Sequence, residues 1–141
     1  MIEQGHRKIV HLTGILRHED AAQRLVGYKR AMEDYDLPYD GLIIEGDFSE
    51  QSGVIAVEKL FTGGPTFTAI FAANDQMAMG IRLALFRRGI RVPDDVSLIG
   101  FDDQPASAFL TPPLTTVQQP AMDIGRSAAA RILAKITDHE E

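Results

Sequence analysis

Polar side chains follow each of the four strands that the sequence predicts, and together they could bind a small hydrophilic molecule. They are, in chain order, His18, Asp20 and Arg24, then Asp47 and Phe48, then Asn74 and Asp75, then Asp102 and Asp103. The carboxyl ends of parallel strands meet at one edge of a sheet, which is where open α/β sheets bind ligands. Carboxylates, an amide, a guanidinium and an aromatic ring suit a polyhydroxylated ligand, and the ring could also stack on a base. We therefore expect one small-molecule site at this edge.

Each of these residues also has a purely structural explanation. Asp20 and Asp75 stand where helix N-caps are expected. Asp102 and Asp103 could be ordinary turn acids. Phe48 could be a core side chain, and Arg24 could be a surface residue of a helix. Their joint position after successive strands favours a binding site over four unrelated explanations.

Signals for catalysis and for metals are weak. The chain lacks a Gly-rich phosphate loop, a nucleophile elbow and an H-E-x-x-H sequence, has no Cys, and its four His lack metal-ligand spacing. Asp102 and Asp103 could hold Mg²⁺ with Asp75 or Asp47, but no phosphate-binding loop accompanies them. We expect no enzyme, no metal and no cofactor, and we expect His11 to be a core histidine within a strand.

Composition limits the classes of partner. A chain of 141 residues holds one domain, or one domain and a fragment, at about 100–200 residues per domain. Fourteen Lys and Arg against twenty Asp and Glu give a net charge of −6, which makes this chain a poor DNA binder. No run of about 18 apolar residues exists, so no membrane-spanning helix is expected. The absence of Cys is compatible with the cytoplasm, which is the expected location, without membrane contact.

Short apolar runs alternate with helical patterns along the chain. Strands are predicted at 7–13, 41–47, 67–73 and 96–101, and helices at 20–35, after Ser49 as its N-cap, at 75–88 and at 120–136. Residues 114–118 are predicted only as an extended piece. This alternation predicts the α/β class, with a three-layer, doubly wound parallel sheet of four strands.

Two helices carry more apolar surface than a single sheet can cover. Helix 75–88 has a second apolar stripe of Met79, Leu83 and Phe86, which packs either on a neighbouring helix or on another subunit. Helix 120–136 has a wide apolar stripe and no strand after it. We expect this last helix to belong to a second domain.

Six motifs occur in one order along the chain. They are Gly5-His6-Arg7-Lys8-Ile9; Arg24-x-x-Gly27-Tyr28; Glu45-Gly46-Asp47-Phe48; Ala73-Asn74-Asp75-Gln76-Met77-Ala78-Met79-Gly80; residues 92–103; and Pro113-Leu114-Thr115-Thr116-Val117. With these motifs the chain resembles the C-terminal part of the ligand-binding region of lactose-repressor/galactose-repressor transcriptional regulators.

The resemblance implies a periplasmic-binding-protein-like fold of type I, in which two subdomains hold the effector between them. Residues 1–118 would be the C-terminal subdomain, and residues 119–141 would form a helix that packs on the N-terminal subdomain. It implies a homodimer and contact with operator DNA only through a headpiece that this sequence lacks. The implied effector contacts are Arg24, Phe48, Asn74 and Asp102, with His18 and Asp20 in a more variable loop. The implied dimer contacts are Met77, Met79, Leu83, Phe86 and Leu110.

Two other functions remain open at this point. An extracytoplasmic sugar-binding receptor of a transport system would use the same fold as a monomer, which the second apolar stripe of helix 75–88 argues against. An enzyme on a similar sheet would need catalytic residues that we do not find. For the effector, a sugar or sugar phosphate is expected, and a purine remains open because of Phe48.

Overall fold

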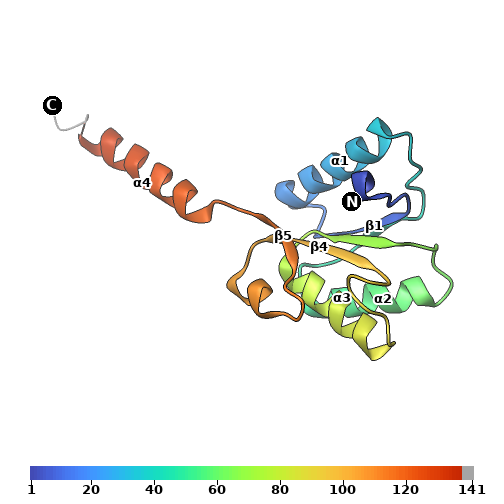
Figure 1. Ribbon diagram of the computed structural model, residues 1–141. Coiled ribbons are helices and arrows are strands. Elements are labelled where there is room, and N and C mark those ends of the chain that lie inside the picture. Colours follow the sequence, from blue (N-terminus) through green and yellow to red (C-terminus); the bar gives the residue numbers. More distant parts are fainter. Residues whose placement is uncertain (138–141) are drawn as a thin grey trace.

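The computed structural model describes residues 1–137 and contains one parallel sheet of five strands (Figure 1). The strands lie in the order β2 (Ile43–Glu45), β1 (Ile9–Thr13), β3 (Ala69–Ala72), β4 (Ser97–Asp102) and β5 (Thr115–Gln118). The predicted parallel sheet is confirmed, but the predicted number of four strands is wrong. The extended piece at 114–118 is the fifth strand, and it pairs with β4 from Ile99 opposite Thr115 to Asp102 opposite Gln118.

Helices cover both faces of the sheet, as the doubly wound prediction requires. Helix α1 (Glu19–Asp34) lies on one face, and α2 (Glu50–Phe61) and α3 (Asp75–Arg87) lie on the other (Figure 1). Helices α2 and α3 approach closely through glycines, since a Cβ at Gly53 would overlap the carbonyl oxygen of Met77 and one at Gly80 that of Glu50. On the α1 side, an apolar groove of about 500 Å³ remains, lined in part by Ile2, Phe71, Ile99, Phe101 and Val117.

Of the three predicted N-caps, one is confirmed and two are wrong. Ser49 caps α2 as predicted, because its Oγ accepts a hydrogen bond of 3.2 Å from the Ser52 N–H. Asn74, and not Asp75, caps α3 by accepting a bond of 2.9 Å from the Met77 N–H. Asp20 is not a cap either, because α1 begins one residue earlier and has His18 at its N-cap position.

The core lies between the sheet and its helices and includes one histidine. His11 is fully buried, with its ring stacked between Tyr28 and Phe71 at centroid distances of 5.0 and 4.6 Å. Its Nδ1 lies 3.0 Å from the Phe71 carbonyl oxygen, and its Nε2 has no hydrogen-bond partner among the described residues. The predicted core role of His11 is confirmed, and burial lowers its pKa to about 4.

Met77 is also a core residue, which corrects its assignment to a subunit interface. Its side chain is fully buried in the main apolar cluster, so a partner surface has no access to it. Met77 faces the core because it falls on the same helical stripe as Ile81, Ala84 and Leu85, all of which are buried. The other four residues of that assignment remain at least partly accessible: Met79, Leu83, Phe86 and Leu110.

Helix α4 (Ala121–Thr137) extends away from the rest of the molecule (Figure 1). None of its residues is buried, and it exposes large apolar side chains at Met122, Ile124, Ile132, Leu133 and Ile136. The remaining four residues of the predicted segment 119–141 lie outside the described residues. Two short 3-10 helices complete the chain, η1 (Ile2–Gln4) and η2 (Pro105–Phe109). No helix within residues 1–137 has the length and hydropathy needed to cross a membrane.

Candidate ligand-binding site

Arg24 reaches from the second turn of α1 to the carboxyl edge of the sheet. Its Nη1 donates a 3.1 Å hydrogen bond to the carbonyl oxygen of Ala73, at the end of β3. One face of its guanidinium lies over the Phe101 ring, 4.2 Å from the centroid. The side chain is only 11% exposed, so it is held in one orientation by packing and hydrogen bonding. Arg24 is therefore a fixed positive group, and not a mobile surface arginine.

Two carboxylates flank this guanidinium. Its Nη2 lies 3.3 Å from Asp20 Oδ2, one helical turn earlier, and 4.0 Å from Asp102 Oδ1, at the end of β4. Asp102 also accepts a 2.8 Å hydrogen bond from Nε2 of Gln119, which follows β5. Burial raises the pKa of Asp102, and the positive charge of Arg24 opposes that shift. The arrangement brings together side chains from α1, β4 and the end of β5.

Phe48 occupies a second part of the same edge. It adopts a left-handed backbone conformation with φ +71°, which is uncommon for a large residue. Nδ2 of Asn74 donates a 2.9 Å bond to its carbonyl oxygen, and its ring lies over Gly14, where a Cβ would overlap the ring. The His18 ring meets it edge-on, with centroids 6.0 Å apart. The strained backbone is thus held by Asn74, and the aromatic ring is presented beside β1.

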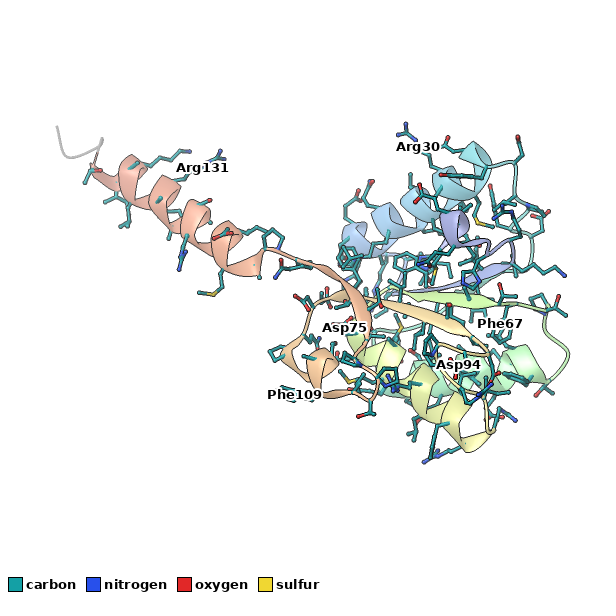
Figure 2. The ribbon with its side chains drawn as sticks, in the orientation of Figure 1. Arg30, Phe67, Asp75, Asp94, Phe109 and Arg131 are labelled. Atoms are coloured by element: carbon teal, nitrogen blue, oxygen red, sulfur yellow. The ribbon has the colours of Figure 1, made fainter. Side chains whose placement is uncertain are left out.

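Two predicted acids are hydrogen-bonded to other groups of the chain itself. Asp47 accepts bonds from the N–H and the hydroxyl of Ser49, which lower its pKa, so it closes the turn before α2. Asp75 is fully buried and accepts hydrogen bonds of 2.8 Å from the Gln104 N–H, 2.7 Å from Ser107 Oγ and 2.5 Å from Thr116 Oγ1. Figure 2 shows Asp75 beneath the end of β4, between α3 and η2.

The structure therefore places the six predicted contact residues in two adjoining groups. Arg24, Asp20 and Asp102 form one, and Phe48, Asn74 and His18 form the other. They adjoin because Arg24 bonds to Ala73, the neighbour of Asn74. The part of the chain that the structure describes has no cluster of His, Asp or Glu side chains suited to a metal ion.

Sequence reasoning missed three residues that shape this edge. Phe101 supports the Arg24 guanidinium, Gln119 orients Asp102, and Gly14 makes room for the Phe48 ring. Phe101 has the pattern of an ordinary strand residue, and Gln119 follows a strand that was not predicted. Gly14 could have been placed at this edge from the sequence, because it directly follows the first predicted strand.

A second surface, on the outer side of α3, holds the accessible residues of the predicted subunit contact. A groove of about 500 Å³ is lined there by Met79, Leu83, Phe86, Leu110 and neighbouring residues. Phe86 is 77% exposed, and Phe109 on η2 is 86% exposed, pointing outward in Figure 2. Large exposed apolar side chains that gather on one side of a molecule are typical of surfaces that bind another molecule.

The fold is that of periplasmic-binding-protein-like domains, which also occur in transcriptional regulators. The family described as periplasmic binding protein-like domain matches residues 1–141. The HTH-type transcriptional repressor PurR of Vibrio atlanticus is 39% identical over 141 residues, covering 99% of this chain and 42% of that protein. Catabolite control protein A of Priestia megaterium is 41% identical over 142 residues, covering 99% and 42%.

Among solved structures, the Lac repressor dimer bound to operator and the anti-inducer ONPF matches with a TM-score of 0.88 and 34% identity, covering 94% of this chain and 48% of that chain. The chain belongs to the periplasmic binding protein-like domain family, in the form found in LacI-family regulators. It spans 42% of the length of each of the two relatives.

Proposed function

We propose that this chain is the effector-binding and dimerisation part of a DNA-binding transcriptional regulator, and that it is not an enzyme. The observation that carries the proposal is the fixed Arg24, supported by Phe101 and flanked by Asp20 and Asp102 at the ligand-binding edge of the sheet. The group offers donors, acceptors and aromatic surface, as a small polar effector requires. The alternative, an extracytoplasmic sugar receptor, is disfavoured because a relative that this chain matches is named a transcriptional repressor.

The division of labour within the chain is part of the proposal. Residues 1–118 would bind the effector from one side, and the helix of residues 119–141 would pack on an N-terminal subdomain of the whole regulator. The fully exposed α4 and its apolar side chains support this division. Operator DNA would be contacted only through a separate headpiece, since this acidic chain suits DNA poorly. The regulator would work in the cytoplasm, without membrane contact.

A homodimer would connect effector binding to DNA. The solved relative is a dimer bound to operator DNA, and the apolar groove on α3 supplies a surface for such a contact here. The effector would stabilise one arrangement of the subdomains, and the dimer would transmit this as a population shift.

Effector binding is testable by ligand-dependent thermal stability of this chain. The panel contains monosaccharides, sugar phosphates and purines, and an effector at about 100 times its Kd should add about 2.7 kcal/mol to the free energy of unfolding. We expect the stabilisation to disappear in Arg24→Ala and in Asp102→Ala. Arg30→Ala is the matched control, because Arg30 lies on the same helix and points away from the site (Figure 2). Stabilisation that persists in both site variants would contradict the proposed site.

A further inference from the structure

We propose that the effector of this site carries no net charge, and that Asp20 is a specificity residue that rejects phosphorylated and carboxylated competitors. This inference rests on the proposed function, and it narrows the class of ligand. It follows from how much of the Arg24 guanidinium is already engaged.

Part of the Arg24 guanidinium is already engaged within the chain. Nη1 is bonded to the Ala73 carbonyl, Nη2 lies beside the Asp20 carboxylate, and one face of the guanidinium is covered by Phe101. An arginine that captures a phosphate or carboxylate usually offers two parallel N–H donors to the anion. Here an anion that approaches Nη2 would compete with the Asp20 carboxylate for that donor.

The charge at this edge also opposes an anion. The single positive charge of Arg24 lies between Asp20 at 3.3 Å and Asp102 at 4.0 Å, so this group has an excess of negative charge. Neighbouring residues at the ends of the strands and the start of α1 add more carboxylates than cations: Glu19, Asp47 and Asp103 against Arg17. A phosphate group placed against Arg24 would lie within a few ångströms of two carboxylates and would be repelled by both.

An uncharged ligand uses the same groups without this conflict. Carboxylates accept hydrogen bonds from hydroxyl or ring N–H groups, and the Phe48 ring and the edge of His18 provide apolar contact. Asp20 is 58% exposed at its side chain, so it can contact a ligand while it remains paired with Arg24. Asp20 thus contributes a hydrogen-bond acceptor for neutral ligands and a repulsive charge against anions.

The test compares matched pairs of probes that differ by one phosphate group. Isothermal titration of this chain would use ribose and ribose 5-phosphate, glucose and glucose 6-phosphate, and guanosine and guanosine monophosphate. For the pair whose neutral member binds, we expect the phosphorylated member to bind at least about tenfold more weakly. In Asp20→Asn the Kd of the phosphorylated probe divided by that of its neutral partner should fall by about threefold or more. The effect is modest because the charge of Asp20 is partly exposed.

Asp40→Asn is the control, because it removes the same charge from the loop before β2, at the opposite edge of the sheet. It should leave the ratio unchanged. A phosphorylated probe that binds wild-type chain as well as its neutral partner would overturn the inference while leaving effector binding intact. An equal change in Asp40→Asn would also overturn it, because it would show a general charge effect. Absence of binding by every probe would count against the proposed function itself, and the inference would fall with it.

Discussion

At the scale of single residues, the environment decides what an ionisable side chain does. Arg24 and Asp102 are partly accessible at the sheet edge and available to a ligand, whereas Asp75 is fully buried and bonded to three groups of the chain. Sequence alone places Asp75 and Asp102 in equivalent positions after neighbouring strands. Their difference arises from η2 and β5, which fold over Asp75 and leave Asp102 at the edge.

Removing the Asp75 carboxylate should be strongly destabilising. Asp75→Ala leaves the Gln104 N–H and the hydroxyls of Ser107 and Thr116 without their acceptor, and we expect a loss of about 3 kcal/mol in the free energy of unfolding by urea denaturation. Asp94→Ala is the control, because Asp94 is exposed and its substitution should stay within about 0.5 kcal/mol. Similar losses in the two variants would disprove a special role for Asp75.

His11 makes stability depend on pH in the acid range. Its pKa is lowered from 6.5 to about 4 in the folded chain, so between these values the unfolded chain takes up a proton that the folded chain does not. Stability contributed by the neutral imidazole is complete above pH 6.5 and is lost as the pH falls toward 4, by about 3 kcal/mol in total. Urea unfolding at pH 7 and pH 4.5 should show this loss in wild type and not in His11→Val. A parallel loss in both proteins would assign the effect to other groups.

At the scale of the elements, apolar periodicity predicted most of the strands and helices, and each wrong prediction has its own physical cause. Strand β5 was missed because Thr115–Gln118 is mostly exposed and lacks an apolar run. The N-cap of α3 was assigned to the wrong residue because Asn74 and Asp75 are adjacent and both are favourable cap residues. Phe101 was missed because a strand residue that supports a ligand-site arginine has the same pattern as one that fills a core.

The contact between α2 and α3 should not tolerate a methyl group. Gly80→Ala would force the Cβ against the Glu50 carbonyl oxygen, and we expect a loss of about 1–3 kcal/mol in the free energy of unfolding. Gly27→Ala, within α1 and with open space around the new Cβ, should instead stabilise the chain by up to about 1 kcal/mol. The two variants are compared by thermal unfolding, and equal effects would mean that helix propensity, and not the close contact, dominates.

The outer side of α3 should control self-association if it is the subunit contact. Leu83→Glu places a charge in the apolar groove, and we expect light scattering to show a lower mass at a given concentration than for wild type. Val26→Glu, at an exposed apolar position on α1 across the sheet, should leave the mass unchanged. An unchanged mass in Leu83→Glu would exclude this side of α3 as the contact.

At the scale of the whole molecule, the chain consists of a sheet domain and a helix that shares no core with it. Sequence predicted the separateness of the last helix from its surplus apolar stripe, and Figure 1 shows it projecting from the sheet domain. None of the residues 1–137 covers that stripe, and the sequence of this chain has no pattern that identifies what would cover it. The sequence likewise predicted which residues form the ligand site, but not which ligand they select.

A chain that ends at residue 118 should fold without α4. No α4 residue is buried, so its removal takes nothing from the core, and the midpoint of cooperative urea unfolding should stay within error of the full chain. Circular dichroism should show reduced helical signal with an unchanged transition. Loss of a cooperative transition in the shortened chain would show that α4 stabilises the sheet domain.

The bonding of Asp75 also has a consequence for the order of events during synthesis on the ribosome. All three of its donors come later in the chain, and the last of them is Thr116. Until that residue has emerged, the carboxylate at the start of α3 must stay hydrated, because burying it without donors is costly. The first three strands and their helices can form earlier, but the closure of β4 and β5 over α3 waits until Thr116 has left the ribosome.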